Sequence, residues 1–151
     1  MKNVAICISG SLRSLEHCKN SIIANIIKPN NKKYNLKLFF YLPNDINSQK
    51  IKLMNDYDPE VLIENDIILK SPNIIWGGRP TSQKIDNEST AGIQGYLQQL
   101  YGIEKNYELV INYEKRNNII FDVILRIRSD VIFKNPIYIT SYNLDKITVP
   151  L

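Results

Sequence analysis

Val4-Ala5-Ile6-Cys7-Ile8-Ser9-Gly10-Ser11-Leu12-Arg13, residues 4–13, is the stretch that decides the fold of this chain. Its first five residues form an unbroken apolar run, which is typical of a strand buried on both faces of a parallel sheet. A short polar turn with one glycine follows, and an amphipathic helix is predicted after it, over residues 14–27. A buried strand, a tight turn and a helix in this order begin a βαβ unit.

The same alternation of strand and helix continues along the chain. Residues 36–42 predict a second buried strand, and residues 48–57 predict a short helix after it. A strand rich in β-branched residues is expected over residues 119–127. Before it, residues 90–116 predict a long helix whose apolar side includes Tyr96, Leu100, Tyr107 and Val110. We therefore predict an α/β fold with a mostly parallel, Rossmann-like sheet and helices on both of its faces.

Weaker strand signals and one irregular region complete the chain. Residues 71–88 contain two prolines and two glycines and show no clean period. A loop of this length is uncommon in a compact domain and is often functional. It is either a surface excursion with Trp76 packed on the core or a flap over a substrate site. Short strands are expected at residues 61–63, 67–69, 131–133, 137–140 and 147–149.

The composition is that of one ordinary globular domain. A chain of 151 residues can bury a substantial core, and 44% hydrophobic and 23% charged residues are typical of a folded protein. The net charge of +4 is scattered, apart from small groups such as Lys28, Lys32 and Lys33. The nine tyrosines do not alternate with the lysines, so nucleic acid is not an expected partner. A small anionic ligand fits the mild positive charge.

Cysteine usage and hydropathy indicate a cytoplasmic protein. Cys7 and Cys18 form neither a Cys-x-x-Cys pair nor a disulfide framework, which favours a reducing compartment. The apolar run at residues 4–8 is too short for the apolar region of a signal peptide. No stretch has the length that a bilayer span needs, so we expect no transmembrane segment.

The turn Ser9-Gly10-Ser11-Leu12-Arg13 is the first candidate site. Open α/β sheets bind ligands beyond the carboxyl ends of their strands, and a glycine there lets the backbone approach a ligand closely. The amides that begin a helix favour anions, and Arg13 adds a forked positive charge. The glycine spacing of a Rossmann fingerprint or a P-loop is absent. The turn is therefore either an anion-binding loop or a plain strand-to-helix turn capped by Ser14.

Arg126-Ile127-Arg128-Ser129-Asp130 is the second candidate site. Residues 126, 128 and 130 share one face of a regular strand, where two arginines and a carboxylate are costly to bury without partners. In one interpretation, Asp130 binds a divalent cation that bridges phosphates, while the arginines neutralise phosphate or keep Asp130 ionised. In the other, the strand simply emerges into water with an Arg–Asp pair.

Both segments resemble parts of GT-A-type glycosyltransferases, which take their sugar from a nucleotide sugar. Residues 4–14 are similar to the first strand and loop of these enzymes. Residues 121–133 are similar to a later strand that ends in a variant of their Asp-x-Asp motif. The order and separation of the segments carry the resemblance, which touches most of residues 1–133. The helix between them also resembles theirs, with Gln94, Gln98, Glu108 and Glu114.

The resemblance implies one GT-A-like domain over residues 1–151 that binds a nucleotide diphosphate sugar, with UDP sugars favoured. The implied activity is transfer of the sugar to a glycan, protein or lipid acceptor that the sequence does not identify. Asp130 would hold Mn²⁺ or Mg²⁺ on the diphosphate, and Gln94 would face the ribose or the sugar, or else solvent. The implied binding residues are Ser9, Gly10, Ser11, Leu12, Arg13, Gln94, Arg126, Arg128 and Asp130.

Two departures from that family keep other functions open. Arg128 stands where the usual motif has its first carboxylate, so a metal would find only one motif carboxylate. These enzymes also continue into an acceptor-binding half, which we expect to be partly missing from residues 1–151. One alternative is a truncated module that binds a nucleotide without transferring a sugar. The other is a flavodoxin-like FMN reductase, because residues 10–13 are similar to its phosphate loop, although Glu16 replaces a serine of that loop. His17, the only histidine, is expected on the surface, and no catalytic residue is assigned.

Overall fold

A computed structural model describes residues 1–65, 75–76, 79–80 and 87–143, with side chains over residues 1–65 and 95–143. The main sheet has four parallel strands in the order β3-β2-β1-β6. β1 (Lys2–Ser9) is an interior strand, paired with β2 (Tyr34–Pro43) on one side and with β6 (Val123–Ile127) on the other. β3 (Glu60–Glu64) pairs with β2 at one edge.

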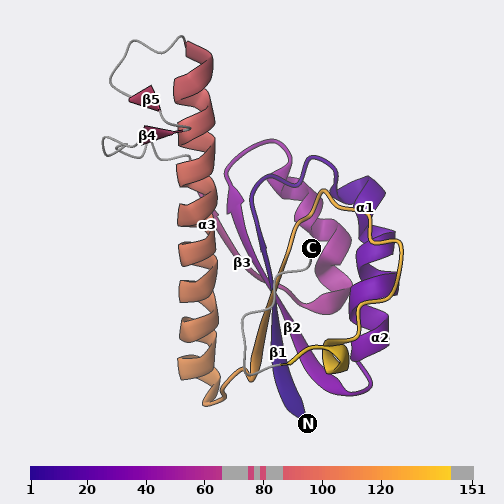
Figure 1. Cartoon of the computed structure of the whole chain (residues 1–151). Helices are drawn as coiled ribbons and strands as arrows, with labels where there is room; N and C mark the ends of the chain where they lie inside the picture. The colour runs from indigo at the N-terminus through magenta and orange to yellow at the C-terminus, as the bar shows by residue number, and fades with distance from the viewer. Residues whose placement is uncertain (66–74, 77–78, 81–86, 144–151) are drawn as a thin grey trace.

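One face of the sheet is covered by helices from the first half of the chain (Figure 1). α1 (Leu15–Ile22), the π-helical turn η1 (Ile23–Ile27) and α2 (Lys28–Asn30) follow one another without a break. The 3₁₀ helix η2 (Ser48–Tyr57) packs beside α1. The predicted helix therefore extends to Asn30 instead of ending before Pro29.

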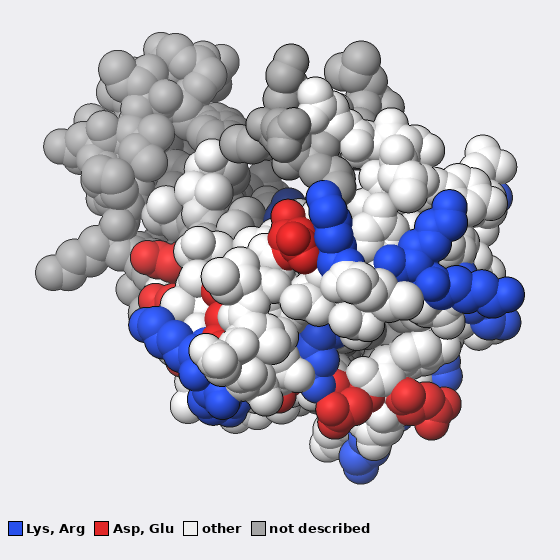
Figure 2. Space-filling model, turned by 90° about the horizontal axis from the view of Figure 1, so that it is seen from below, with Lys and Arg blue, Asp and Glu red and all other residues white. Residues whose placement is uncertain are grey.

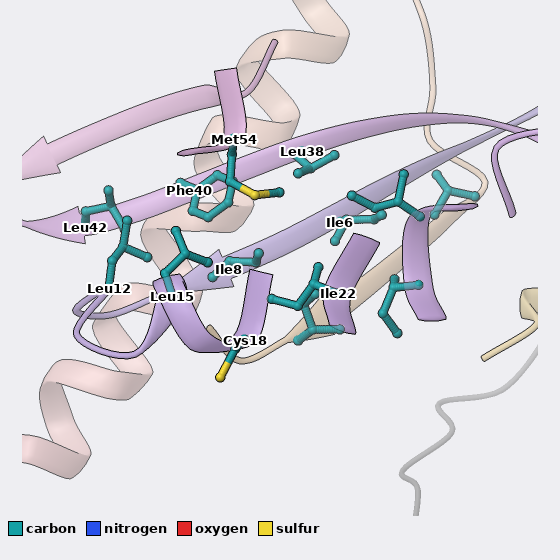
Figure 3. Packing of buried hydrophobic residues seen from close by; sticks show 14 of the residues in the cluster. Ile6, Ile8, Leu12, Leu15, Cys18, Ile22, Leu38, Phe40, Leu42 and Met54 are labelled. Carbon is teal, nitrogen blue, oxygen red and sulfur yellow. The ribbon is translucent and has the colours of Figure 1, made fainter. Parts of the chain in front are cut away.

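The main core lies between these helices and the sheet. Figure 3 shows side chains of β1 and β2, Phe40 among them, gathered in one cluster with side chains of α1 and with Met54 of η2. Burial of this kind is the chief stabilising term of a domain. The fully buried members include Ile6, Ile8, Leu12, Leu15, Ile22, Leu38, Phe40, Leu42 and Met54.

The other face is covered by the single long helix α3 (Asn87–Asn117) (Figure 1). Its buried positions are Gly102, Asn106 and Val110, four residues apart. Below them, Phe39 of β2 packs edge-on against Phe121 and Tyr113, with ring centroids 5.4 and 5.5 Å apart. The predicted apolar side of this helix was wrong at Tyr96, Leu100 and Tyr107, which are 43%, 45% and 52% exposed. A glycine and an asparagine face the sheet instead, which an apolar periodicity does not reveal.

These two layers confirm the predicted α/β fold, with a parallel, Rossmann-like sheet and helices on both faces. β4 (Ile75–Trp76) and β5 (Arg79–Pro80) form a separate antiparallel pair. The side chain of Trp76 and the predicted strands at residues 67–69 and 147–149 lie outside the described residues.

The strands predicted at residues 131–133 and 137–140 are wrong. There the chain crosses the outside of α1 and η1 and pairs with no strand. Near its end it forms the 3₁₀ turn η3 (Ile139–Ser141). Its backbone polar groups are satisfied by the helices: Phe133 N donates to Ser21 Oγ at 3.2 Å and Ile137 N donates to Asn25 O at 2.8 Å. The buried amide of Asn30 accepts from Ile139 N at 3.0 Å. The backbone N–H groups of an extended, apolar segment can thus form hydrogen bonds without a neighbouring strand.

The strand predicted from residue 119 begins four residues later. Asn118 adopts a left-handed conformation with φ 51°, which ends α3 and turns the chain back. Glu114 stabilises this turn, because its carbonyl accepts from Ile119 N at 3.2 Å and its carboxylate accepts from Phe121 N at 2.7 Å.

No helix in the described part of the chain is both long and apolar enough to cross a membrane.

Truncation of Phe40 tests the main core. Phe40 is fully buried, so Phe40→Ala should lower the free energy of unfolding by about 3–5 kcal/mol, measured by urea denaturation. Ile46→Ala is the matched control, because Ile46 is 85% exposed and its truncation should change stability by less than about 0.5 kcal/mol. Equal effects of the two substitutions would contradict this core.

Candidate functional site

The turn after β1 has a backbone conformation that requires glycine. Gly10 has φ +106°, a region that side chains strongly disfavour, although a Cβ there would meet nothing within 4 Å. Gly10 N donates to Tyr41 O at 3.0 Å, which holds the turn against the end of β2. The requirement for glycine is therefore one of backbone strain and not of space.

Side-chain hydrogen bonds connect this turn to the loops after β2 and β6. Ser11 Oγ donates to Asp45 Oδ2 at 2.7 Å, and Asp45 Oδ1 accepts from the backbone N–H groups of Asn47 and Ser48. From the other side, Ser129 Oγ donates to the carbonyl of Ser11 at 3.2 Å. Partial burial alone would raise the pKa of Asp45, but the hydrogen bonds from Ser11, Asn47 and Ser48 together lower it. Three loops at the carboxyl edge are thus fixed to one another.

A cavity of about 470 Å³ opens at this edge of the sheet, and we call it the cleft. In Figure 1 the first half of α3 extends beyond the carboxyl ends of the strands, and this part of the helix forms one wall of the cleft. Gly102 permits that approach, since a Cβ there would lie 3.2 Å from Tyr41 Cδ1. The lining residues are Ser9, Gly10, Ser11, Arg13, Tyr41, Pro43, Asp45, Gly95, Gln98, Gln99, Tyr101, Gly102, Arg126, Arg128, Ser129 and Asp130.

The charges in the cleft favour an anion. Arg128 binds Asp130 with both arms of its guanidinium, Nε to Oδ1 at 2.8 Å and Nη2 to Oδ2 at 2.7 Å. These bonds lower the pKa of Asp130 and raise that of Arg128, so both groups stay charged. Within the described part of the chain, the guanidinium groups of Arg13 and Arg126 have no hydrogen-bond or ion-pair partner. Two unpaired arginines therefore remain for a ligand.

The described residues at the opposite edge of the sheet carry mixed charges. Figure 2 views the molecule from below, at the amino ends of the strands, where lysines and arginines lie among aspartates and glutamates. Exposed charges of both signs in such a mixture are ordinary solvated surface.

Most residues predicted for the site line the cleft, and Leu12 does not. The turn residues and the second candidate segment come together because β1 and β6 are neighbours in the sheet. Leu12 is instead fully buried in the main core, where it anchors the turn and cannot contact a ligand with its side chain. Gln94 belongs to α3, but its side chain lies outside the described residues. His17 is exposed on α1, as predicted.

Several lining residues were not found from the sequence. Tyr41 and Tyr101 form an edge-on ring pair with centroids 6.0 Å apart, and both hydroxyls donate to Glu64, at 3.2 and 3.4 Å. Asp45 lies two residues after the end of β2, and an acidic residue after that strand was the one available signal. Nothing in the apolar pattern indicated the two tyrosines.

A smaller apolar recess of about 150 Å³ adjoins the cleft, because Ser9 and Arg126 line both. Asn106 also lines it, and its Nδ2 donates to the carbonyls of Ile8 and Phe39 at 2.8 and 3.3 Å. Its Oδ1 is buried without a hydrogen-bond partner among the described residues. An unpaired buried acceptor is costly unless something donates to it.

The residues of the cleft do not suit a divalent cation. Mg²⁺ and Mn²⁺ prefer several oxygen ligands, usually carboxylates. Both oxygens of Asp130 already accept from Arg128, and both oxygens of Asp45 accept from Ser11 and from backbone N–H groups. Over the described ranges, no three His, Cys, Asp or Glu side chains gather closely enough to hold a metal ion.

The fold and the cleft define a Rossmann-like parallel α/β domain with an arginine-lined cleft at its carboxyl edge. The chain belongs to the family described as a domain of unknown function (DUF7796), whose model matches residues 1–151. No protein of curated function and no solved structure matches the chain.

Alanine at Gly10 tests the strained turn. Gly10→Ala should lower the free energy of unfolding by about 1 kcal/mol or more, because alanine disfavours a positive φ. Gly95→Ala is the matched control: Gly95 lies within α3, a Cβ there also meets nothing within 4 Å, and alanine should raise stability by up to about 1 kcal/mol. Chemical denaturation of both variants measures the difference, and a destabilising effect of equal size at both positions would contradict the account.

Proposed function

We propose that the cleft binds a nucleoside diphosphate sugar and that this domain serves a glycosyltransferase. One observation carries the proposal: Arg13, Arg126 and Arg128 line a single cleft beside the glycine turn at the carboxyl edge of a parallel sheet. This edge is where open α/β sheets bind their ligands. The resemblance of residues 4–14 and 121–133 to GT-A enzymes selects a nucleotide sugar among anionic ligands.

The arginines suit a diphosphate for geometric and electrostatic reasons. A guanidinium presents N–H groups in a planar fork that matches two phosphate oxygens. Arg13 comes from the turn after β1, whereas Arg126 and Arg128 come from the end of β6 and the loop after it. Their positive charge can therefore be spread along a diphosphate rather than concentrated on one phosphate. The cavity of about 470 Å³ lies within the usual range of ligand sites, and the apolar recess beside Arg126 offers a surface to the less charged part of the ligand.

The same groups would assist the transfer of the sugar. The bond between the anomeric carbon and the diphosphate oxygen breaks, and its electron pair leaves with the diphosphate. The acceptor hydroxyl oxygen forms the new bond to the anomeric carbon, and its proton passes to the leaving diphosphate or to water. Fixed positive groups stabilise the charge that develops on the leaving diphosphate, because they need no reorganisation as the bond breaks. In this proposal the arginines supply leaving-group stabilisation, and no described side chain is assigned as the base.

Calorimetry of nucleotide binding tests the proposal. UDP, GDP, UDP-glucose and FMN are titrated separately into the wild-type protein and into Arg126→Gln. At least one nucleoside diphosphate or nucleotide sugar should bind, and Arg126→Gln should weaken that binding about tenfold or more, since hydrogen bonds to charged groups contribute about 1.5–3 kcal/mol. Arg116→Gln is the control, because Arg116 pairs with Glu60 away from the cleft; this variant should bind like the wild type.

The outcomes separate the candidate functions. Binding of FMN without binding of any nucleoside diphosphate would contradict the proposal and favour a flavodoxin-like reductase. Binding of a nucleotide sugar with no hydrolysis or transfer of its sugar would leave a nucleotide-binding module. Loss of binding in Arg116→Gln equal to that in Arg126→Gln would show that the cleft is not the site.

A further inference from the structure

The way Asp130 is held conflicts with a role as metal ligand. Both of its oxygens accept from Arg128, at 2.8 and 2.7 Å, in a bidentate pair. A metal would have to share these oxygens with the guanidinium and would lie beside three arginines that line the same cleft. Like charges close together repel strongly where solvent is partly excluded. The Asp130 carboxylate, which suggested a metal site, is therefore already paired with Arg128.

We propose that this cleft binds the diphosphate of its ligand without a divalent cation, and that Asp130 is a positioning residue for Arg128. The inference rests on the proposed ligand class, a nucleoside diphosphate, and specifies how that ligand is held. Arg13, Arg126 and Arg128 carry the positive charge that a metal ion would otherwise supply. Asp130 keeps the guanidinium of Arg128 in one orientation.

The pair leaves Arg128 able to bind a ligand. A guanidinium has five N–H bonds. Asp130 accepts from one on Nε and one on Nη2, so three remain for phosphate oxygens. The side chains of Arg128 and Asp130 are 56% and 42% exposed, so a ligand can reach the pair. A fixed fork loses less conformational freedom on binding than a free one does, which favours affinity.

The two roles of Asp130 predict different metal dependences for Asp130→Asn. If Asp130 ligates a metal, Asp130→Asn removes the ligand and weakens nucleotide binding only when the metal is present. If Asp130 positions Arg128, asparagine removes one of the two hydrogen bonds that fix the guanidinium. Nucleotide binding should then weaken in the absence of metal as much as in its presence.

Calorimetric titration of UDP in two buffers tests the proposal. The wild-type protein is titrated once in EDTA and once in excess Mn²⁺, and the dissociation constants should agree within about threefold. In EDTA, Asp130→Asn should bind UDP about threefold more weakly than the wild type or worse, and Arg128→Gln about tenfold more weakly or worse. Excess Mn²⁺ should leave both ratios unchanged. Asp58→Asn is the matched control, since Asp58 pairs with Lys37 outside the lining of the cleft and asparagine tolerates its left-handed φ of 44°.

Each result decides for or against the proposal. Binding that needs Mn²⁺ and falls in Asp130→Asn would overturn it while leaving the proposed function intact. Equal binding of Asp130→Asn and the wild type in EDTA would also overturn it, because Asp130 would then not position Arg128. No binding of UDP in either buffer would count against the proposed ligand class itself. The comparison of buffers uses the wild-type protein alone, so it does not depend on the folding of a variant.

Discussion

The parallel pairing of β1 with β2 on one side and with β6 on the other is the constraint on which the rest of the structure depends. Parallel strands end at the same edge, so this pairing brings the turn after β1 beside the end of β6, although more than a hundred residues separate them. Both faces of β1 must then be covered, because its side chains on either side are apolar. α1 and η2 cover one face, α3 covers the other, and the edge between these layers remains open to ligand.

The loops at the carboxyl edge of the sheet are held in place by hydrogen bonds to one another. Ser11 is the common partner: its hydroxyl donates to Asp45 after β2, and its carbonyl accepts from Ser129 after β6. Leu12, next in the chain, is buried in the core and holds the turn from beneath. Such fixed positions matter for binding an anion, because donors that are already in place lose little freedom when the ligand arrives. The same fastening gives Arg13 and Arg128 a common cleft.

The sequence predicted the fold well where the apolar pattern was continuous, and less well where polar groups replaced it. β1 and the helix after it were found because both are uniformly or periodically apolar. The face of α3 on the sheet was missed because Gly102 and Asn106 serve close approach and hydrogen bonding, not apolar contact. The segment near Phe133 was predicted as a strand because an apolar extended stretch is identical in pattern whether a strand or a helix satisfies its backbone. For the site, the residue types alone indicated that the arginines contribute to an anion site. Only the structure shows that the carboxylate of Asp130 accepts hydrogen bonds from Arg128.

The most direct test of a ligand site at the carboxyl edge is a map of ¹⁵N–¹H chemical-shift changes on titration with UDP. If the cleft binds the nucleotide, the largest changes should fall in residues 9–13, 95–102 and 126–130, the segments that contribute most of its lining. They should saturate together with one dissociation constant, since one ligand contacts all three segments. Largest changes among Lys28, Lys32 and Lys33 at the far end of α1 and η1, or no saturating change at all, would contradict a site in the cleft.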